Sequence, residues 1–172
     1  PGGVIGDNFR AGVFTSSNNF DVEMNVFGGQ VGDNLLVAEG AVVNISGGNV
    51  GSVNANRPDG IVNISGGTVG SAAVSEGLIN ISGGTLTFGV AVFDGPNADM
   101  DVFAGTLNLT GSEFFLDGVA ISGLVPGEPL TITDRDVTLT GVLADGSPFS
   151  MDLNSTFGAG DFVDSNATLT VS

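Results

Sequence analysis

The residues best suited to chemistry are two pairs of closely spaced carboxylates in the C-terminal half of the chain. Asp99 lies two residues before Asp101, and Asp134 lies two residues before Asp136. If each pair lies on a strand, both side chains leave the same face and can share a hard cation such as calcium. A polysaccharide-cleaving site needs similar groups, either paired carboxylates or a base with calcium. The competing interpretation is solvated surface acid at the start of a strand.

Several residue types that enzymes rely on are missing. The sequence has no His, Cys, Trp or Tyr, and its 3 basic residues are all Arg. Without His and Cys, the common triads, thiol chemistry and most zinc sites are excluded. Without Tyr and Trp, a sugar ring loses its usual stacking partners. We therefore predict that the chain is not an enzyme, has no catalytic residue and needs no cofactor, with calcium as the one candidate ion.

The charge balance restricts the choice of partners. The chain has 19 acidic and 3 basic residues, for a formal net charge of −16. Phosphate binding needs clustered Arg and Lys, so we expect neither a nucleic-acid partner nor an anionic membrane surface. No run of 18 apolar residues exists, so we expect no membrane insertion.

One motif recurs along the chain. Residues 43–51 read Val-Asn-Ile-Ser-Gly-Gly-Asn-Val-Gly, and 62–70 and 79–87 are close copies. Residues 24–32 and 100–108 are looser copies. The second glycines of the copies fall at steps of 19, 19, 17 and 21 residues, at Gly29, Gly48, Gly67, Gly84 and Gly105. A fixed period near 20 residues is typical of a solenoid.

The motif itself predicts what kind of solenoid this is. Its first four residues alternate apolar and polar, as a strand with one buried face does, and the two glycines permit a turn. A single rung cannot bury its apolar side alone, so successive rungs must stack. We predict an all-β fold, a parallel β-helix with rungs of about 19 residues. Ile45, Ile64 and Ile81 should then form one inner column.

Stacking also aligns polar side chains on the outer face. Two rows are expected, one of Asn25, Asn44, Asn63 and Asn80 and one of Ser46, Ser65 and Ser82. Amides one rung apart can hydrogen-bond along the stack, which would fix the register. The alternative is a polar strip that binds a sugar or a surface. We favour the structural ladder because the stacking of rungs needs no ligand.

The rest of the chain completes a single domain over residues 1–172. We expect an N-terminal cap or entry segment over 1–19, repeat rungs over 20–109, and irregular rungs with an antiparallel β cap over 110–172. Asp145-Gly146 predicts a hairpin, and residues 167–171 predict a last strand. The cap would cover the open edge of the last rung.

The Ile/Val-Asn-Ile-Ser-Gly-Gly-Thr-Val motif resembles right-handed β-helix repeats of large secreted bacterial proteins, of the autotransporter-passenger and adhesin type. The tail, including Leu116-Asp-Gly-Val-Ala-Ile-Ser-Gly-Leu and residues 131–147, resembles a segment that closes β-helices in planctomycete extracellular proteins. The resemblance implies a secreted or cell-surface location and carries over no catalytic residue.

Two functions remain as expectations. The first is a non-catalytic structural or adhesive solenoid outside the cell, which associates with itself and could build fibres or a surface layer end to end. The second is a carbohydrate-binding or polysaccharide-cleaving β-helix with a glycan surface as its partner. The chain begins Pro1-Gly2-Gly3, which is compatible with a processed chain and with a fragment of a longer one.

Overall fold

The computed structural model describes residues 2–12, 22–87, 101–102, 104–157 and 161–172. These residues form sixteen strands and no helix. The strands are β1 (Val4–Ile5), β2 (Arg10–Ala11), β3 (Val22–Val31), β4 (Leu35–Val37), β5 (Ala41–Ala55), β6 (Ile61–Val74), β7 (Leu78–Leu86), β8 (Asp101–Val102), β9 (Thr106–Leu109), β10 (Gly111–Leu116), β11 (Val119–Ala120), β12 (Leu130–Thr131), β13 (Thr138–Leu143), β14 (Pro148–Asp152), β15 (Phe162–Val163) and β16 (Thr168–Val171).

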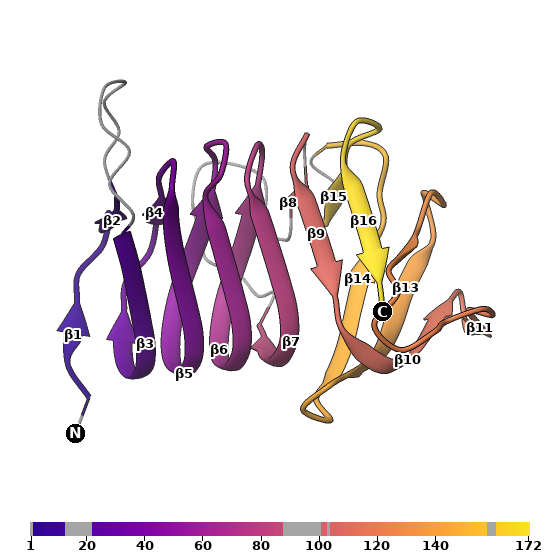
Figure 1. The fold of residues 1–172 in the computed structure, drawn as a ribbon, viewed down its shortest axis with the longest axis horizontal. Helices are drawn as coiled ribbons and strands as arrows, with labels where there is room; N and C mark the ends of the chain where they lie inside the picture. Colours follow the sequence, from indigo (N-terminus) through magenta and orange to yellow (C-terminus); the bar gives the residue numbers. More distant parts are fainter. Residues whose placement is uncertain (1, 13–21, 88–100, 103, 158–160) are drawn as a thin grey trace.

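Most of the strands build one parallel coil. The order β1-β3-β5-β6-β7-β9-β16 runs along the long axis of the molecule, and every neighbouring pair in it is parallel (Figure 1). The long strands β5 and β6 bend around a corner, so each supplies two walls of its rung. The predicted fold class is therefore confirmed: an all-β parallel solenoid with rungs of about 19 residues.

The inner side chains stack in single file. Ile45 pairs with Ile64, and Ile64 pairs with Ile81, at 0–1% exposure each. The column continues to Val26 at one end and through Leu109 to Val171 at the other. Each such aliphatic side chain contributes about 1.5–3 kcal/mol when it leaves water, so the column is a main source of cohesion.

The paired glycines are required at the corner after the first wall of each rung, the wall that carries Ile45, Ile64 and Ile81. Gly29, Gly48, Gly67 and Gly84 all have positive φ, between 83° and 93°. A Cβ on Gly67 would also lie 2.9 Å from the carbonyl carbon of Gly47 on the preceding rung. Rungs can stack at this corner because neither backbone carries a side chain there.

The coil also includes residues near the N-terminus. β1 pairs in parallel with Gln30 and Val31 of β3, and β2 pairs in parallel with β4. Residues 4–11, within the stretch expected as a cap or entry segment, thus add parallel strands to two walls of the coil.

The fifth copy of the motif has a different register from the predicted one. The sequence alignment placed Gly105 beside Gly84, but Thr106 pairs with Leu78, so Asn108 lies beside Asn80. Asp101, which that alignment matched to the repeat Asn, pairs with Ala73 on another wall. The alignment on Gly105 was therefore wrong. At this position the coil requires only a strand in which aliphatic and polar residues alternate, and it does not require the glycine pair. Residues 106–109 supply such a strand.

The antiparallel part is an insertion into the coil. β10, β11, β13 and β14 form a four-stranded antiparallel sheet in the order β11-β10-β13-β14. The predicted hairpin at Asp145-Gly146 joins β13 to β14. After this sheet the chain returns to the coil, where β15 and β16 add parallel strands beside β8 and β9. The outer edge of β16 is covered by the short antiparallel β12.

Candidate functional site

The most regular polar feature is a chain of amide hydrogen bonds along the first wall. Each Asn Nδ2 donates to the Asn Oδ1 of the preceding rung: Asn44 to Asn25 (3.0 Å), Asn63 to Asn44 (2.8 Å), Asn80 to Asn63 (2.8 Å) and Asn108 to Asn80 (2.9 Å). The Thr170 hydroxyl ends the series by donating to Asn108 Oδ1 at 2.7 Å. We call these six side chains the asparagine ladder.

The two ends of the asparagine ladder differ. All its amide donors point toward the N-terminal end of the coil, so Asn25 has no ladder acceptor ahead of it. Asn25 Nδ2 instead donates to Glu23 Oε1 on its own strand at 3.1 Å, and Asn44 shares that acceptor at 3.1 Å. A carboxylate of the same strand thus accepts the hydrogen bond that the other ladder amides donate to the preceding rung.

A second, shorter amide row lies at another corner. Asn34 Nδ2 donates to Asn8 Oδ1 at 2.8 Å, and Asn54 Nδ2 donates to Asn34 Oδ1 at 3.1 Å. This row was not predicted from the sequence. Its signal is the Gly-Asp-Asn triplet at residues 6–8 and again at 32–34. Asn8 and Asn34 both have positive φ, which Asn tolerates better than most residues do.

The predicted serine row is less regular. A register shift pairs Ser46 with Gly66 and Ser65 with Gly83, so serine does not lie beside serine in the strand register. Ser46 and Ser65 are exposed. Ser82 is half-buried, and its hydroxyl donates to the Ile64 carbonyl at 3.5 Å.

Only one of the two candidate calcium pairs, Asp134 with Asp136, lies fully within the described residues. Asp99 and the side chain of Asp101 lie outside them. Asp134 and Asp136 lie in the connection between β12 and β13, not on one strand, so the expectation of a shared strand face was wrong. No group of three or more metal-ligating side chains occurs among the described residues.

Asp136 has a structural partner instead. It has positive φ (59°), and its Oδ1 accepts from Ser155 N at 2.9 Å and Ser155 Oγ at 2.8 Å. These bonds, the backbone one first, hold the pKa of Asp136 below its usual value. Nearby, the Arg135 guanidinium donates to the carbonyls of Ile132 and Asp134.

Asp145 joins the inserted sheet to the coil. Its Oδ2 accepts from Gly84 N at 2.7 Å, and its own N–H donates to the Ser82 carbonyl at 3.2 Å. Its carboxylate also accepts from the N–H and hydroxyl of Ser147. Partial desolvation raises the pKa of Asp145, but the hydrogen bonds from Ser147 and Gly84 outweigh it and leave the pKa lowered. The hairpin tip therefore takes the place of a next rung at this corner.

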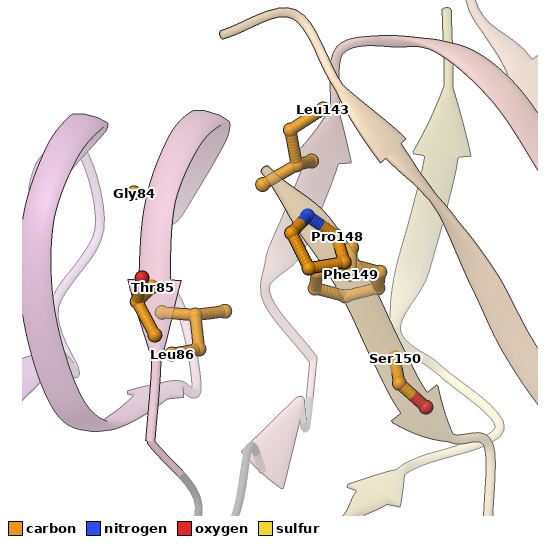
Figure 2. Close-up of a pocket in the computed structure, with 7 residues that line it drawn as sticks. All are labelled: Gly84, Thr85, Leu86, Leu143, Pro148, Phe149 and Ser150. Carbon is orange, nitrogen blue, oxygen red and sulfur yellow. The ribbon is translucent and has the colours of Figure 1, made fainter. Parts of the chain in front are cut away.

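Two hollows lie next to these elements. One of about 290 Å³ lies where β7 faces β14, with Thr85 and Leu86 on one side and Pro148 and Phe149 on the other (Figure 2). Its described lining is mostly apolar and includes no carboxylate. A second, of about 360 Å³, is lined by Asp7, Asn8, Asp33, Asn34 and Ser52. Asp7 Oδ1 there accepts from Asp33 N at 2.9 Å, a contact that joins two rungs.

Comparison with known proteins identifies no family for the chain. No protein-family model, no curated protein and no solved structure matches it. The part of the chain that the structure describes contains no helix long and apolar enough to cross a membrane.

Proposed function

We propose that this chain is a non-catalytic structural solenoid that acts outside the cell, as a stiff scaffold or adhesive stalk. The asparagine ladder is the observation that supports this proposal. The polar side chains repeated most faithfully in the sequence donate to and accept from one another, so on this wall they hold rungs together. A surface selected for ligand binding would instead keep its repeated polar groups available to the ligand.

The extracellular location is part of the proposal. Its support is the resemblance of the Asn-Ile-Ser-Gly-Gly repeat to secreted and cell-surface β-helices, together with a net charge of −16 that keeps such a surface soluble. Head-to-tail growth into fibres, expected from the sequence, would require β12 to leave the edge of β16. The scaffold role does not depend on such growth.

Three measurements test the proposal. An antibody raised against the purified chain should label intact producing cells or their medium without permeabilisation, and small-angle X-ray scattering should give an elongated, rigid particle. A panel of plant, algal and microbial polysaccharides, offered with and without calcium, should yield neither saturable binding nor new reducing or unsaturated ends. Labelling only after permeabilisation would show that the protein is inside the cell and would contradict the extracellular role. Saturable binding or cleavage of one polysaccharide would replace the scaffold with the carbohydrate-active alternative.

A further inference from the structure

The sequence carries a signal for covalent modification that the scaffold role does not use. The tripeptide Asn-x-Ser/Thr, with any residue but Pro at x, is the acceptor for N-linked oligosaccharides. It occurs six times, beginning at Asn44, Asn63, Asn80, Asn108, Asn154 and Asn166. Because the oligosaccharide is attached to the side-chain nitrogen, Nδ2 of the acceptor must be accessible in the folded chain. The structure distinguishes the six asparagines by this requirement.

Four of the six belong to the asparagine ladder. Asn44, Asn63, Asn80 and Asn108 are half-buried, and each donates Nδ2 to the preceding rung at 2.8–3.0 Å. Each also lies in a strand that pairs in parallel with a strand on either side. A transferase would have to open the coil to reach these nitrogens. The four tripeptides therefore follow from the repeat and are closed to modification.

Asn154 is closed as well. It is half-buried, and its Nδ2 donates to the Asp161 carbonyl at 2.8 Å. Its own carbonyl accepts from Val163 N at 2.9 Å, beside a parallel bridge to Phe162. Both the side chain and the backbone of this asparagine are thus held by residues 161–163.

Asn166 differs from the other five. It lies in the turn between β15 and β16, its side chain is exposed, and its Nδ2 has no hydrogen-bond partner among the described residues. The turn is held without that side chain, because Asp164 Oδ1 accepts from Asn166 N at 2.8 Å and Asp164 O accepts from Ala167 N at 3.1 Å. Thr168, the hydroxyl residue of the tripeptide, is exposed too. Both residues that define the acceptor are therefore accessible.

We propose that Asn166 accepts an N-linked oligosaccharide and is the preferred acceptor of the six in the folded chain. The donor is an oligosaccharide joined to a polyprenyl pyrophosphate, and a separate transferase catalyses the step. Nδ2 attacks the anomeric carbon of the first sugar, and the C–N bond forms as the C–O bond to the pyrophosphate breaks. The Nδ2 proton passes to a base of the transferase, the lipid pyrophosphate leaves, and nothing is oxidised or reduced. This inference rests on the proposed extracellular role, because N-linked oligosaccharides belong to secreted and surface proteins.

Transfer to the purified, folded chain tests the choice of asparagine. The transferase is one that modifies both of two capped peptides, residues 152–156 and 164–168, which share the pattern Asp-x-Asn-x-Thr. Any preference in the folded chain then comes from the structure and not from the local sequence. Mass spectrometry should find one oligosaccharide per chain, at Asn166. Transfer to Asn154 should be slower by about tenfold or more, because the hydrogen bond of its Nδ2 must open first.

Three variants locate the acceptor. Asn166→Gln should abolish transfer, and Asn154→Gln is the matched control that should leave it unchanged. Thr168→Val keeps the asparagine and a residue suited to a strand, but it should also abolish transfer because the hydroxyl is lost. Circular dichroism checks that all three variants fold. Equal transfer to Asn154 and Asn166, transfer to the asparagine ladder, or no transfer to Asn166 would overturn the proposal.

The chain taken from its producing cells gives a second test. When recovered from the medium or the cell surface, it should exceed the mass of the bare sequence by one oligosaccharide, attached at Asn166. An unmodified chain outside the cell would overturn this inference and leave the scaffold role intact. A chain found only inside the cell would contradict the proposed function itself, and the natural modification with it.

Discussion

The coil and the inserted sheet are held together in different ways. In the coil, Ile45, Ile64 and Ile81 contact their own counterparts, and the same is true of Asn44, Asn63 and Asn80. In the sheet of β10, β11, β13 and β14, most strand pairs join unlike residues, and the ring of Phe114 packs against Gly111 and Gly141. Cohesion in the coil is thus spread over equivalent rungs, whereas in the sheet it depends on a few individual side chains.

The largest expected effect is loss of the Phe114 ring. Phe114 is 1% exposed, and the two glycines beside it leave no side chain that could fill the space. Phe114→Ala should lower the free energy of unfolding by about 3–5 kcal/mol. Hydrogen exchange should show lost protection in β10, β13 and β14 with β5 and β6 still protected. Equal loss in the coil would mean that the two regions unfold as one unit.

A pair of glycine variants separates rung stacking from backbone conformation. Gly67 and Gly146 both have positive φ, 83° and 87°. A Cβ on Gly67 meets backbone of the preceding rung at 2.9 Å, but one on Gly146 meets nothing within 4 Å. Gly146→Ala should lower the free energy of unfolding by about 1 kcal/mol, because only the backbone conformation becomes less favourable. Gly67→Ala should lower the free energy of unfolding by about 3 kcal/mol or more, because the new methyl group also clashes with the preceding rung. Urea unfolding followed by circular dichroism measures both, and equal costs would contradict close rung stacking at the corner.

The asparagine ladder predicts an intermediate effect. In Asn63→Asp, the carboxylate cannot donate to Asn44 Oδ1, so two acceptors face each other. We expect the free energy of unfolding to fall by about 1–3 kcal/mol at neutral pH. Asn49→Asp adds the same charge on an exposed residue of the same coil and should change stability little. If the two variants lose equal stability, charge alone is responsible and the ladder contributes nothing measurable.

The smallest effect concerns the contact between the two regions. The folded pKa of Asp145 is lowered, so its contribution to stability is present above the unfolded pKa and is lost as pH falls through the folded pKa. Asp145→Ala should cost on the order of 1 kcal/mol or less at neutral pH, since the carboxylate is exposed to solvent. The difference from wild type should shrink below about pH 4. A difference that stays constant with pH would exclude the carboxylate as the cause.

Other features of the molecule could be predicted only in part. The hairpin at Asp145-Gly146 and the strand at 167–171 were both expected and are both present. The sequence did not reveal that the last strand is a rung of the coil, paired with β9. It also gave no sign that Asp134 and Asp136 lie in a connection, because a two-residue spacing is the same in a strand and in a loop.

By itself, the sequence determined the coil: the period, the inner column of Ile45, Ile64 and Ile81, and the amide stack of Asn25 to Asn80. A repeated motif carries this information locally, since each residue has only to meet its own counterpart one rung away. The tertiary structure decided where the repeat is interrupted and resumed. Asn108 bonds to Thr170 across 62 residues, and that pairing requires only short aliphatic–polar strands that many stretches of the chain could supply. Which of them pair depends on where the chain returns to the coil after the inserted sheet, and no short segment of sequence encodes that.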